Sequence, residues 1–328
     1  MRRRSLVRAG ALVIVSCGAA AQPSRKVWRI GILGLAKPSD LVGPAQQTPL
    51  THALIEGLRD LGYLPGKHFV ITSRNSGGVP ERLPGLAAEL VREQVDVIVA
   101  AGPTLPALKQ ATSTIPVVMA AAGDPVGSGY VQSLGRPGGN ITGMSLQSAD
   151  LTGKRIEMLK EIVAGLAPVA VLWDRPGIVY WQAAQTAARE RGWKLVSLEV
   201  QGAQDIEGAF KTAVDSQART VLVSGAAAIF FPHRQHVAEV AARSRLPVMY
   251  ELRPFAEAGG LISYGADIND LWRRSAVFVD KILRGAKPAD LPVEQPTKFE
   301  LVIDLKTGKA LGLAIPQALR LRTDEVIE

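Results

Sequence analysis

The sequence is almost devoid of cysteine, which limits the chemistry that the protein can perform. Cys17 is the only cysteine among 328 residues, so the chain cannot form a disulfide within itself. Cleavage of the amino-terminal segment after Cys17 would leave a mature protein without a thiol. Cysteine catalysis, thiol redox chemistry and zinc sites built on cysteine are then excluded.

The sequence also lacks the motifs of the common nucleotide-binding and hydrolytic enzymes. The segment GILGLA, 31–36, does not have the GxGxxG spacing of a pyrophosphate turn. The glycine-rich segment RPGGN, 136–140, precedes a strand-like stretch instead of opening a helix. No GxxxxGK[ST] loop and no GxSxG elbow occur. We therefore expect no cofactor and a protein that is not an enzyme.

Basic residues do not gather into a block that would bind nucleic acid. The formal net charge is +8, and four arginines lie in the first 21 residues, which leaves 8 − 4 = +4 for the remainder. No Lys/Arg block follows them, and no motif of the usual DNA- or RNA-binding modules is present. The composition argues against nucleic acid as a partner.

The amino terminus, residues 1–21, has the pattern of a secretory signal peptide. A basic start is followed by a short apolar run and by three alanines that end at Ala21. The apolar run is too short to span a bilayer permanently, for which about 20 residues are needed. An ordinary buried helix, a twin-arginine signal and a lipoprotein box ending at Cys17 are the alternatives. We favour cleavage near Ala21 and a periplasmic protein, with a lipid anchor on Cys17 as the less favoured form.

Strand and helix patterns alternate through two successive series. Short apolar runs that are typical of buried parallel strands are separated by amphipathic stretches with helical spacing. The strand-like runs of the first series are 28–36, 68–74, 95–102 and 115–121, and those of the second are 169–175, 193–200, 220–225, 246–251 and 259–265. This alternation predicts an α/β protein with two lobes, each a doubly wound parallel sheet.

The stretch 115–145 joins the two series and organises the chain around it. It combines a buried strand, the break GDPVGSG and a Pro- and Gly-rich connection. A long amphipathic helix at 268–285 is expected to return to the first lobe, and a last strand at 299–304 to the second. The chain would then cross between lobes near Thr142, Ala266 and Glu294, and such a hinge favours closure around a ligand. The predicted boundaries are 1–21 for the signal peptide, 27–143 plus 266–293 for lobe 1, and 144–265 plus 294–328 for lobe 2.

Several segments resemble the ABC transporter substrate-binding protein family with a periplasmic-binding-protein type I fold. The most specific are GDPVGSGYVQSLGRPGGNITG at 123–143 and PADLPVEQPTKFELVIDLKT at 288–307. The resemblance extends from about Trp28 to Glu328, and it is to the branch that includes tryptophan- and tyrosine-type receptors. It implies a receptor outside the cytoplasm that delivers a solute to a membrane permease.

Candidate ligand contacts are residues at the carboxyl ends of parallel strands, where open α/β sheets bind ligands. Helix starts attract carboxylates, acidic side chains accept from an ammonium, and aromatic rings stack on apolar or cationic groups. In lobe 1 the candidates are Gly34, Leu35, Gly102, Thr104 and Asp124. In lobe 2 they are Trp173, Asp174, Gly225, Tyr250, Glu251 and Tyr264, with Asp267 just past the second crossing.

Some candidates have a structural interpretation beside the functional one. Asp124 precedes a proline and can cap the turn GDPVG. Tyr250 and Tyr264 can be core residues, whereas we expect Trp173 to face the cleft. His233 and His236 share a helix face, but no third ligand is evident, so we expect a solvated face and no metal.

The favoured hypothesis is a monomeric receptor that closes its lobes on a small organic solute, such as an amino acid or an aromatic acid. One alternative is a secreted enzyme that uses Asp124 and Glu251 as acid and base, which requires the two carboxylates to face each other across the cleft. The other alternative is a periplasmic ligand sensor for a membrane kinase.

Overall fold

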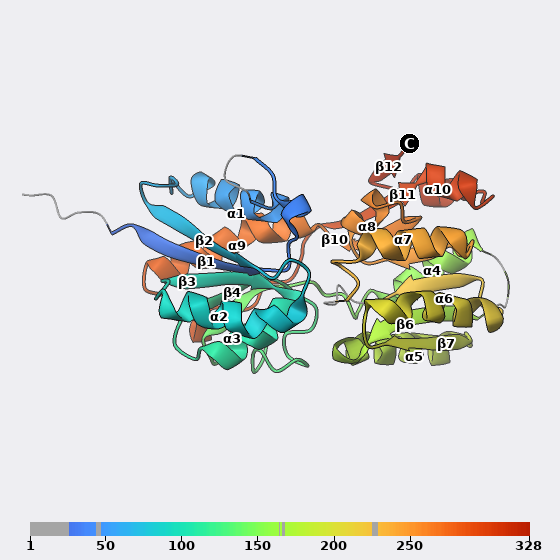
Figure 1. Cartoon of the computed structure of the whole chain (residues 1–328). Helices are drawn as coiled ribbons and strands as arrows, with labels where there is room; N and C mark the ends of the chain where they lie inside the picture. The colour runs from blue at the N-terminus through green and yellow to red at the C-terminus, as the bar shows by residue number, and fades with distance from the viewer. Residues whose placement is uncertain (1–25, 44–46, 164, 166–167, 225–228) are drawn as a thin grey trace, which may run out of the picture.

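The computed structural model describes residues 26–43, 47–163, 165, 168–224 and 229–328. Two lobes lie side by side, and the colours of Figure 1 show that the chain passes between them more than once. The expected signal peptide, with Cys17, falls outside the described residues. Within the described parts, no helix combines the length and the apolar character that crossing a membrane requires.

The first lobe is a five-stranded parallel sheet with helices on both faces. The strand order is β2-β1-β3-β4-β5, as a doubly wound sheet requires. The strands are β1 (Trp28–Gly34), β2 (Phe69–Asn75), β3 (Val97–Ala101), β4 (Val117–Ala122) and β5 (Ile141–Ser145). The helices are α1 (Pro49–Asp60), α2 (Leu83–Arg92), α3 (Leu105–Ala111) and α9 (Ile268–Leu283).

Alternation of side chains along each strand gives this sheet two separate apolar faces. On β3, Val97 and Val99 pack into the core that includes α1 and α9, whereas Ile98 and Ala100 pack into the core that includes α2 and α3. Successive residues of a strand point to opposite faces, so a strand covered on both sides is apolar throughout. This explains why the strands of the first series appear in the sequence as continuous apolar runs.

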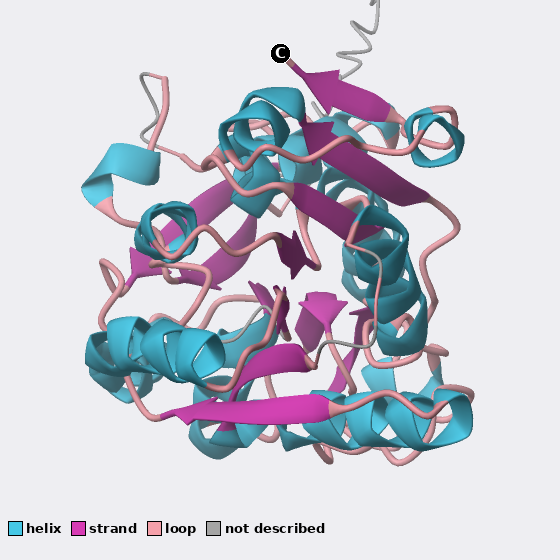
Figure 2. Ribbon diagram, turned by 90° about the vertical axis from the view of Figure 1, so that its right-hand side faces the viewer, coloured by secondary structure: helices cyan, strands magenta, loops and turns pink. Residues whose placement is uncertain are grey.

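The second lobe has a seven-stranded sheet in the order β12-β11-β10-β9-β8-β6-β7. Its strands are β6 (Val169–Asp174), β7 (Leu195–Val200), β8 (Thr220–Val223), β9 (Val248–Tyr250), β10 (Ile262–Ala266), β11 (Phe299–Asp304) and β12 (Glu325–Ile327). Its helices are α4 (Thr152–Ile162), α5 (Ile178–Arg191), α6 (Ile206–Asp215), α7 (Arg234–Arg243), α8 (Arg253–Glu257), α10 (Leu305–Ala310) and α11 (Gln317–Arg320). Figure 2 shows helices on both sides of the strands.

The fold agrees with two doubly wound lobes, but the second sheet is not wholly parallel. β11 pairs antiparallel with β10. The cause is the path of the chain, because β10 runs toward the hinge and β11 enters the same lobe from the hinge. The short elements α8 and β12 have no counterpart in the sequence-based prediction, since runs of 5 and 3 residues carry too little periodicity.

Three crossings of the chain lie together between the lobes. The first follows Ser145 at the end of β5, the second is at Asp267 between β10 and α9, and the third follows Glu294. The first and third are joined by backbone hydrogen bonds: Ser145 N donates to Glu294 O at 2.8 Å, and Glu294 N donates to Gly143 O at 2.9 Å. A hinge of several strands of this kind permits bending of one lobe toward the other.

Helix α9 returns to the first lobe and packs tightly on α1. A Cβ atom on Gly57 of α1 would lie 2.2 Å from the carbonyl oxygen of Arg273, so only glycine permits this approach. The Asp267 side chain caps the start of α9 by accepting from the N–H groups of Asn269 and Asp270, both at 3.0 Å. The second crossing is therefore fixed at its helical end.

Arg155 of α4 binds the lobe-2 side of two crossings. Its side chain is 1% exposed, and it donates to Ser148 O, just after the first crossing, at 2.7 Å. It also donates to Tyr264 O, just before the second crossing, at 2.7 Å. Its ionic partner is the buried carboxylate of Glu251, at 3.3 Å. This guanidinium therefore holds two crossings and the end of β9 in one arrangement.

We predict that Arg155→Met destabilises the protein by about 3 to 5 kcal/mol, because Glu251 would be left buried without its charge partner. Chemical denaturation measures the free energy of unfolding. The matched control is Arg322→Met, which removes an exposed ion pair with Glu161 and should cost less than about 1 kcal/mol. Similar losses in both variants would contradict the assigned role of Arg155.

Candidate functional site

A cavity of about 600 Å³ lies between the lobes. Its lobe-1 wall contains the carboxyl ends of β1, β3 and β4, the start of α1 and the start of α9. Its lobe-2 wall contains α8 and the segment that leads into α7. The carboxyl ends of parallel strands are where ligands bind in open α/β sheets, and the volume suits a small organic molecule.

Local capping positions the lobe-1 wall. Thr48 precedes Pro49 at the start of α1, and its Oγ1 accepts a hydrogen bond from Thr51 N at 3.1 Å. The side chain of Thr104 donates to Ala101 O at 3.0 Å, which holds the turn between β3 and α3. The first bond is a helix N-cap and the second holds the turn that leads into α3, and both lie at helix starts that line the cavity.

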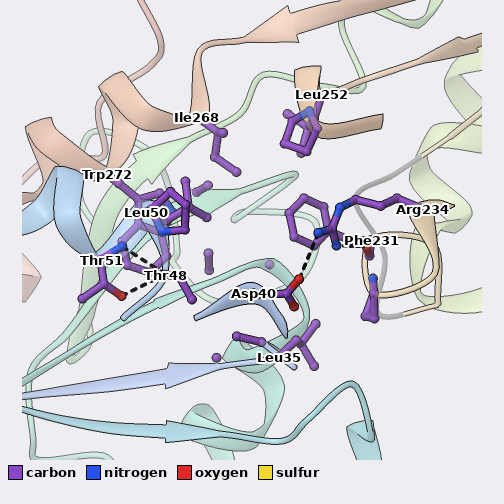
Figure 3. A pocket seen from close by; sticks show the side chains of 18 of the residues that line it. Leu35, Asp40, Thr48, Leu50, Thr51, Phe231, Arg234, Leu252, Ile268 and Trp272 are labelled. Carbon is purple, nitrogen blue, oxygen red and sulfur yellow. Dashed lines mark hydrogen bonds and ion pairs between the residues drawn. The ribbon is translucent and has the colours of Figure 1, made fainter. Parts of the chain in front are cut away.

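One half of the cavity is apolar. Figure 3 shows Leu50, Ile268 and Trp272 from lobe 1 on this side, with Leu252 from lobe 2 opposite them. Ile268, Trp272 and Leu252 are 7%, 5% and 2% exposed, so they form a rigid wall that belongs to the core. The Nε1 donor of Trp272 is buried and has no hydrogen-bond acceptor among the described residues.

The cavity wall also carries four charged side chains whose formal charges cancel. Asp40 from lobe 1 and Arg234 from lobe 2 form an ion pair at 3.1 Å across the cavity (Figure 3). Arg253 and Glu257, both on α8, pair at 2.7 Å. A cavity with balanced charges favours a solute without net charge over a singly charged one, because an unmatched charge is costly to desolvate.

Four of the predicted contacts lie in the cavity wall. Gly34 ends β1 and Leu35 follows it, and Gly102 and Thr104 follow β3. All four lie at or just after the carboxyl end of a parallel strand in lobe 1, as the prediction requires. Gly225 lies outside the described residues.

Asp124 caps a turn beside the cleft and is not part of the cavity wall. Its Oδ1 accepts from Gly127 N at 2.8 Å. Next to it, Gly123 receives the phenol of Tyr180 from lobe 2, and a Cβ atom there would lie 1.6 Å from the Tyr180 oxygen. Burial, together with Glu251, raises the pKa of the Tyr180 phenol well above its ordinary value. The two lobes are thus in direct contact on this side.

The expectation that Trp173 faces the cleft is corrected by the structure. Trp173 is 5% exposed, packs with Val169 and Val171 in the core beneath α4 and α5, and stacks on Trp181 with ring centroids 6.0 Å apart. Its Nε1 donates to Ser197 Oγ at 2.8 Å. The physical reason is the two-residue repeat of the strand, which places residues 169, 171 and 173 on one face.

Two other aromatic candidates also lie in the body of lobe 2. Tyr250 is fully buried and stacks on Phe255 of α8 with ring centroids 5.0 Å apart. Tyr264 is half-buried, with its ring 6.4 Å from that of Phe299. Neither side chain lines the cavity. Both tyrosines therefore follow the second of their two predicted roles, which is packing within the lobe.

The remaining acidic candidates serve the scaffold. Glu251 is 2% exposed and pairs with Arg155, and Asp267 caps α9. Asp174 is 1% exposed and accepts from Gly177 N at 3.1 Å at the start of α5. Asp124 accepts from Gly127 N and Glu251 pairs with Arg155, so each carboxylate of the enzymatic alternative has a partner within its own lobe. No cluster of potential metal ligands occurs among the described residues.

Sequence reasoning missed the residues that give the cavity its character. Asp40 stands in a short turn, Pro38–Asp40, after β1, and Arg234 begins α7 directly after His233. Leu50 and Trp272 belong to the starts of two helices that come together only through the packing of α9 on lobe 1. One signal was present in the sequence, because Asp40 lies in a loop that follows a strand of the first series. The same rule does not identify Arg234, Leu50 or Trp272.

A family model for ABC transporter substrate binding protein matches residues 43–327. The chain belongs to this family. Its members are substrate-binding proteins that act outside the cytoplasm. A Tyrosine-binding protein of Clostridioides difficile (strain R20291) is 25% identical over 295 residues, which cover 88% of this chain and 82% of that protein.

Solved structures agree with this membership. A conserved domain protein from Vibrio cholerae O1 biovar El Tor is 26% identical, with a TM-score of 0.83 over 92% of this chain and 100% of that one. An ABC domain in complex with L-Trp from Streptococcus pneumonia is 25% identical, with a TM-score of 0.82 and the same two coverages. The family's two-lobed fold therefore extends over nearly the whole chain.

We predict that Asp174→Asn makes this family member more stable at neutral pH, because burial raises the pKa of Asp174 to about 6. The folded protein binds this proton more tightly than the unfolded chain, so the wild type loses stability as pH rises from about 4 through 6. Asparagine keeps an acceptor for Gly177 N and has no charge to bury. The variant should be more stable by roughly 2 to 3 kcal/mol at about pH 8 and equal at about pH 4.

Denaturant unfolding of both proteins across this pH range provides the measurement. A stability difference that does not change with pH would contradict the assigned burial of a titrating carboxyl group.

Proposed function

We propose that the protein is the solute receptor of an ABC importer, which closes its two lobes around an aromatic amino acid and delivers it to a membrane permease. It would act in the periplasm as a monomer. The observation that carries the proposal is the cavity itself, which takes walls from both lobes and lies beside a hinge of three crossings. A solute that touches both walls stabilises the closed form over the open one.

The shape of the cavity supports an amino acid with a large apolar side chain. Leu50, Ile268, Trp272 and Leu252 offer an apolar surface on which an aromatic ring would pack. The four charged side chains of the cavity wall have no net formal charge, which suits a zwitterion. The similarity to a tyrosine-binding protein and to a structure that holds L-Trp supports the same class of solute.

Delivery to a permease is supported by family membership and by the hinge of three crossings between the lobes. A permease must distinguish loaded from empty receptors, and the relative position of two lobes is a signal that a docking partner can recognise. The enzymatic alternative requires Asp124 and Glu251, and neither of these residues lines the cavity.

We predict that L-tryptophan or L-tyrosine raises the thermal unfolding midpoint of the purified protein. A ligand at a hundred times its dissociation constant stabilises the folded form by about 2.7 kcal/mol. Leu50→Arg should abolish the shift, because a long charged side chain would occupy the apolar half of the cavity. Leu61→Arg, at the other end of α1 and exposed, is the matched control and should keep the shift.

The ligand should be recovered chemically unchanged after the experiment. Consumption of the amino acid would favour an enzyme, and the absence of a shift with every amino acid would contradict the proposed solute class.

A further inference from the structure

We propose that Asp40 and Arg234, one from each lobe, recognise the α-ammonium and α-carboxylate groups of the solute. The pair would then select a complete amino acid over an amine or an acid of the same shape. The assignment rests on the proposed function and names the two residues that determine which chemical class the cleft accepts.

The pair joins the two lobes at the wall of the cavity. Asp40 Oδ1 and Arg234 Nη2 are 3.1 Å apart, and both side chains line the cavity. Their side chains are 25% and 28% exposed, so they are partly desolvated but still reachable. Charges at such depth interact more strongly with a ligand than charges at the open surface.

Both groups keep unused hydrogen-bonding capacity. Asp40 accepts from Lys37 N at 2.8 Å through Oδ2 and from Arg234 through Oδ1, whereas a carboxylate offers about four acceptor sites. Arg234 donates to Asp40 and to Phe231 O at 3.1 Å, and a guanidinium has five N–H donors. Within the described chain, three of these donors have no acceptor. Arg234 can therefore bind a ligand carboxylate while it still faces Asp40.

The local structure holds both groups in place for this task. Asp40 closes the turn Pro38–Asp40 by its bond to Lys37 N, so its carboxylate has one fixed direction. The Arg234 guanidinium lies over the Phe231 ring, with its carbon 5.3 Å from the ring centroid. A planar guanidinium that is oriented on an aromatic face is suited to two parallel bonds with a carboxylate.

The second charged pair of the cavity, Arg253 and Glu257, is less available to bind a ligand than Asp40 and Arg234. Arg253 is engaged by Glu257 and Glu325, each at 2.7 Å, and it also faces Glu300 at 3.9 Å. This network joins α8 to β11 and β12 within lobe 2, so its charges are neutralised before a ligand arrives. Asp40 and Arg234, by contrast, are each other's ionic partners only when the lobes are close together.

The position of the pair also fits a ligand of the proposed shape. Figure 3 shows Asp40 and Arg234 on one side of the cavity and Leu50, Ile268 and Trp272 on the other. An amino acid bound with its charged groups at the pair would direct its side chain into the apolar half. The ammonium beside Asp40 and the carboxylate beside Arg234 would place four charges in alternating order, which favours the bound zwitterion.

A simple latch between the lobes would use the same ion pair but would behave differently in binding experiments. A latch changes the equilibrium between open and closed forms, so its loss lowers the affinity for every ligand by the same factor. If the pair contacts the ligand, its loss lowers the affinity only for ligands that carry the matching charged group. This difference allows the two roles to be separated by comparing ligands.

The test measures the affinities of L-tryptophan, tryptamine and indole-3-propionate by titration calorimetry for the wild type, Asp40→Asn and Arg234→Gln. Asparagine keeps an acceptor for Lys37 N, so the turn at Asp40 is preserved. Asp40→Asn should lower the affinity for L-tryptophan and tryptamine about 10- to 100-fold and leave that for indole-3-propionate nearly unchanged.

Arg234→Gln should lower the affinity for L-tryptophan and indole-3-propionate by a similar factor and leave that for tryptamine nearly unchanged.

The matched controls are Glu207→Gln and Arg243→Gln, which break an exposed ion pair of 2.7 Å in lobe 2 away from the cavity. They should leave all three affinities unchanged. The same measurements with L-tyrosine, tyramine and 3-(4-hydroxyphenyl)propionate cover a receptor that prefers a phenol.

Equal weakening of all three ligands in both variants would assign the pair to a latch and overturn the proposal, and so would unchanged affinities. A wild-type protein that binds neither amino acid would instead contradict the proposed function, and this assignment with it.

Discussion

The arrangement of the two lobes depends on the bonds that the buried guanidinium of Arg155 makes. It lies in the second lobe and binds the backbone beside two of the three crossings, while Glu251 balances its charge. A charge in this position is costly unless all its partners are present, so the hinge has one favoured arrangement at its lobe-2 end. Because the crossings lie together, bending about them brings the carboxyl ends of the lobe-1 strands toward α7 and α8.

The cleft has an apolar part and a charged part, and each part takes side chains from both lobes. Lobe 1 supplies strand ends and the starts of α1 and α9, whose apolar side chains continue its core to the cavity wall. Lobe 2 supplies Arg234 and Arg253 from two helix starts. The ion pair with Asp40 spans 194 positions of sequence, and it exists only because both sheets present their loops to the same space.

Residues near strand ends can line the cavity or pack into the core of a lobe, and this structure contains examples of both. Gly34, Leu35, Gly102 and Thr104 lie at or just after the ends of strands of lobe 1 and line the cavity. Trp173 and Tyr250 lie at or next to the ends of strands of lobe 2, yet the two-residue repeat of each strand directs them into a core covered by helices. A place at the end of a strand was therefore sufficient to find part of the lobe-1 wall and misleading for these aromatic residues of lobe 2.

The sequence by itself determined the alternation of strands and helices in two successive series and the family to which the chain belongs. These features depend on local periodicity and on short motifs, which are present in the chain before it folds. The tertiary structure alone decided the antiparallel direction of β11, the burial of Trp173 and the meeting of Asp40 with Arg234. These depend on which side chains packing brings together, and segments that are distant along the chain carry no local signal of their contact.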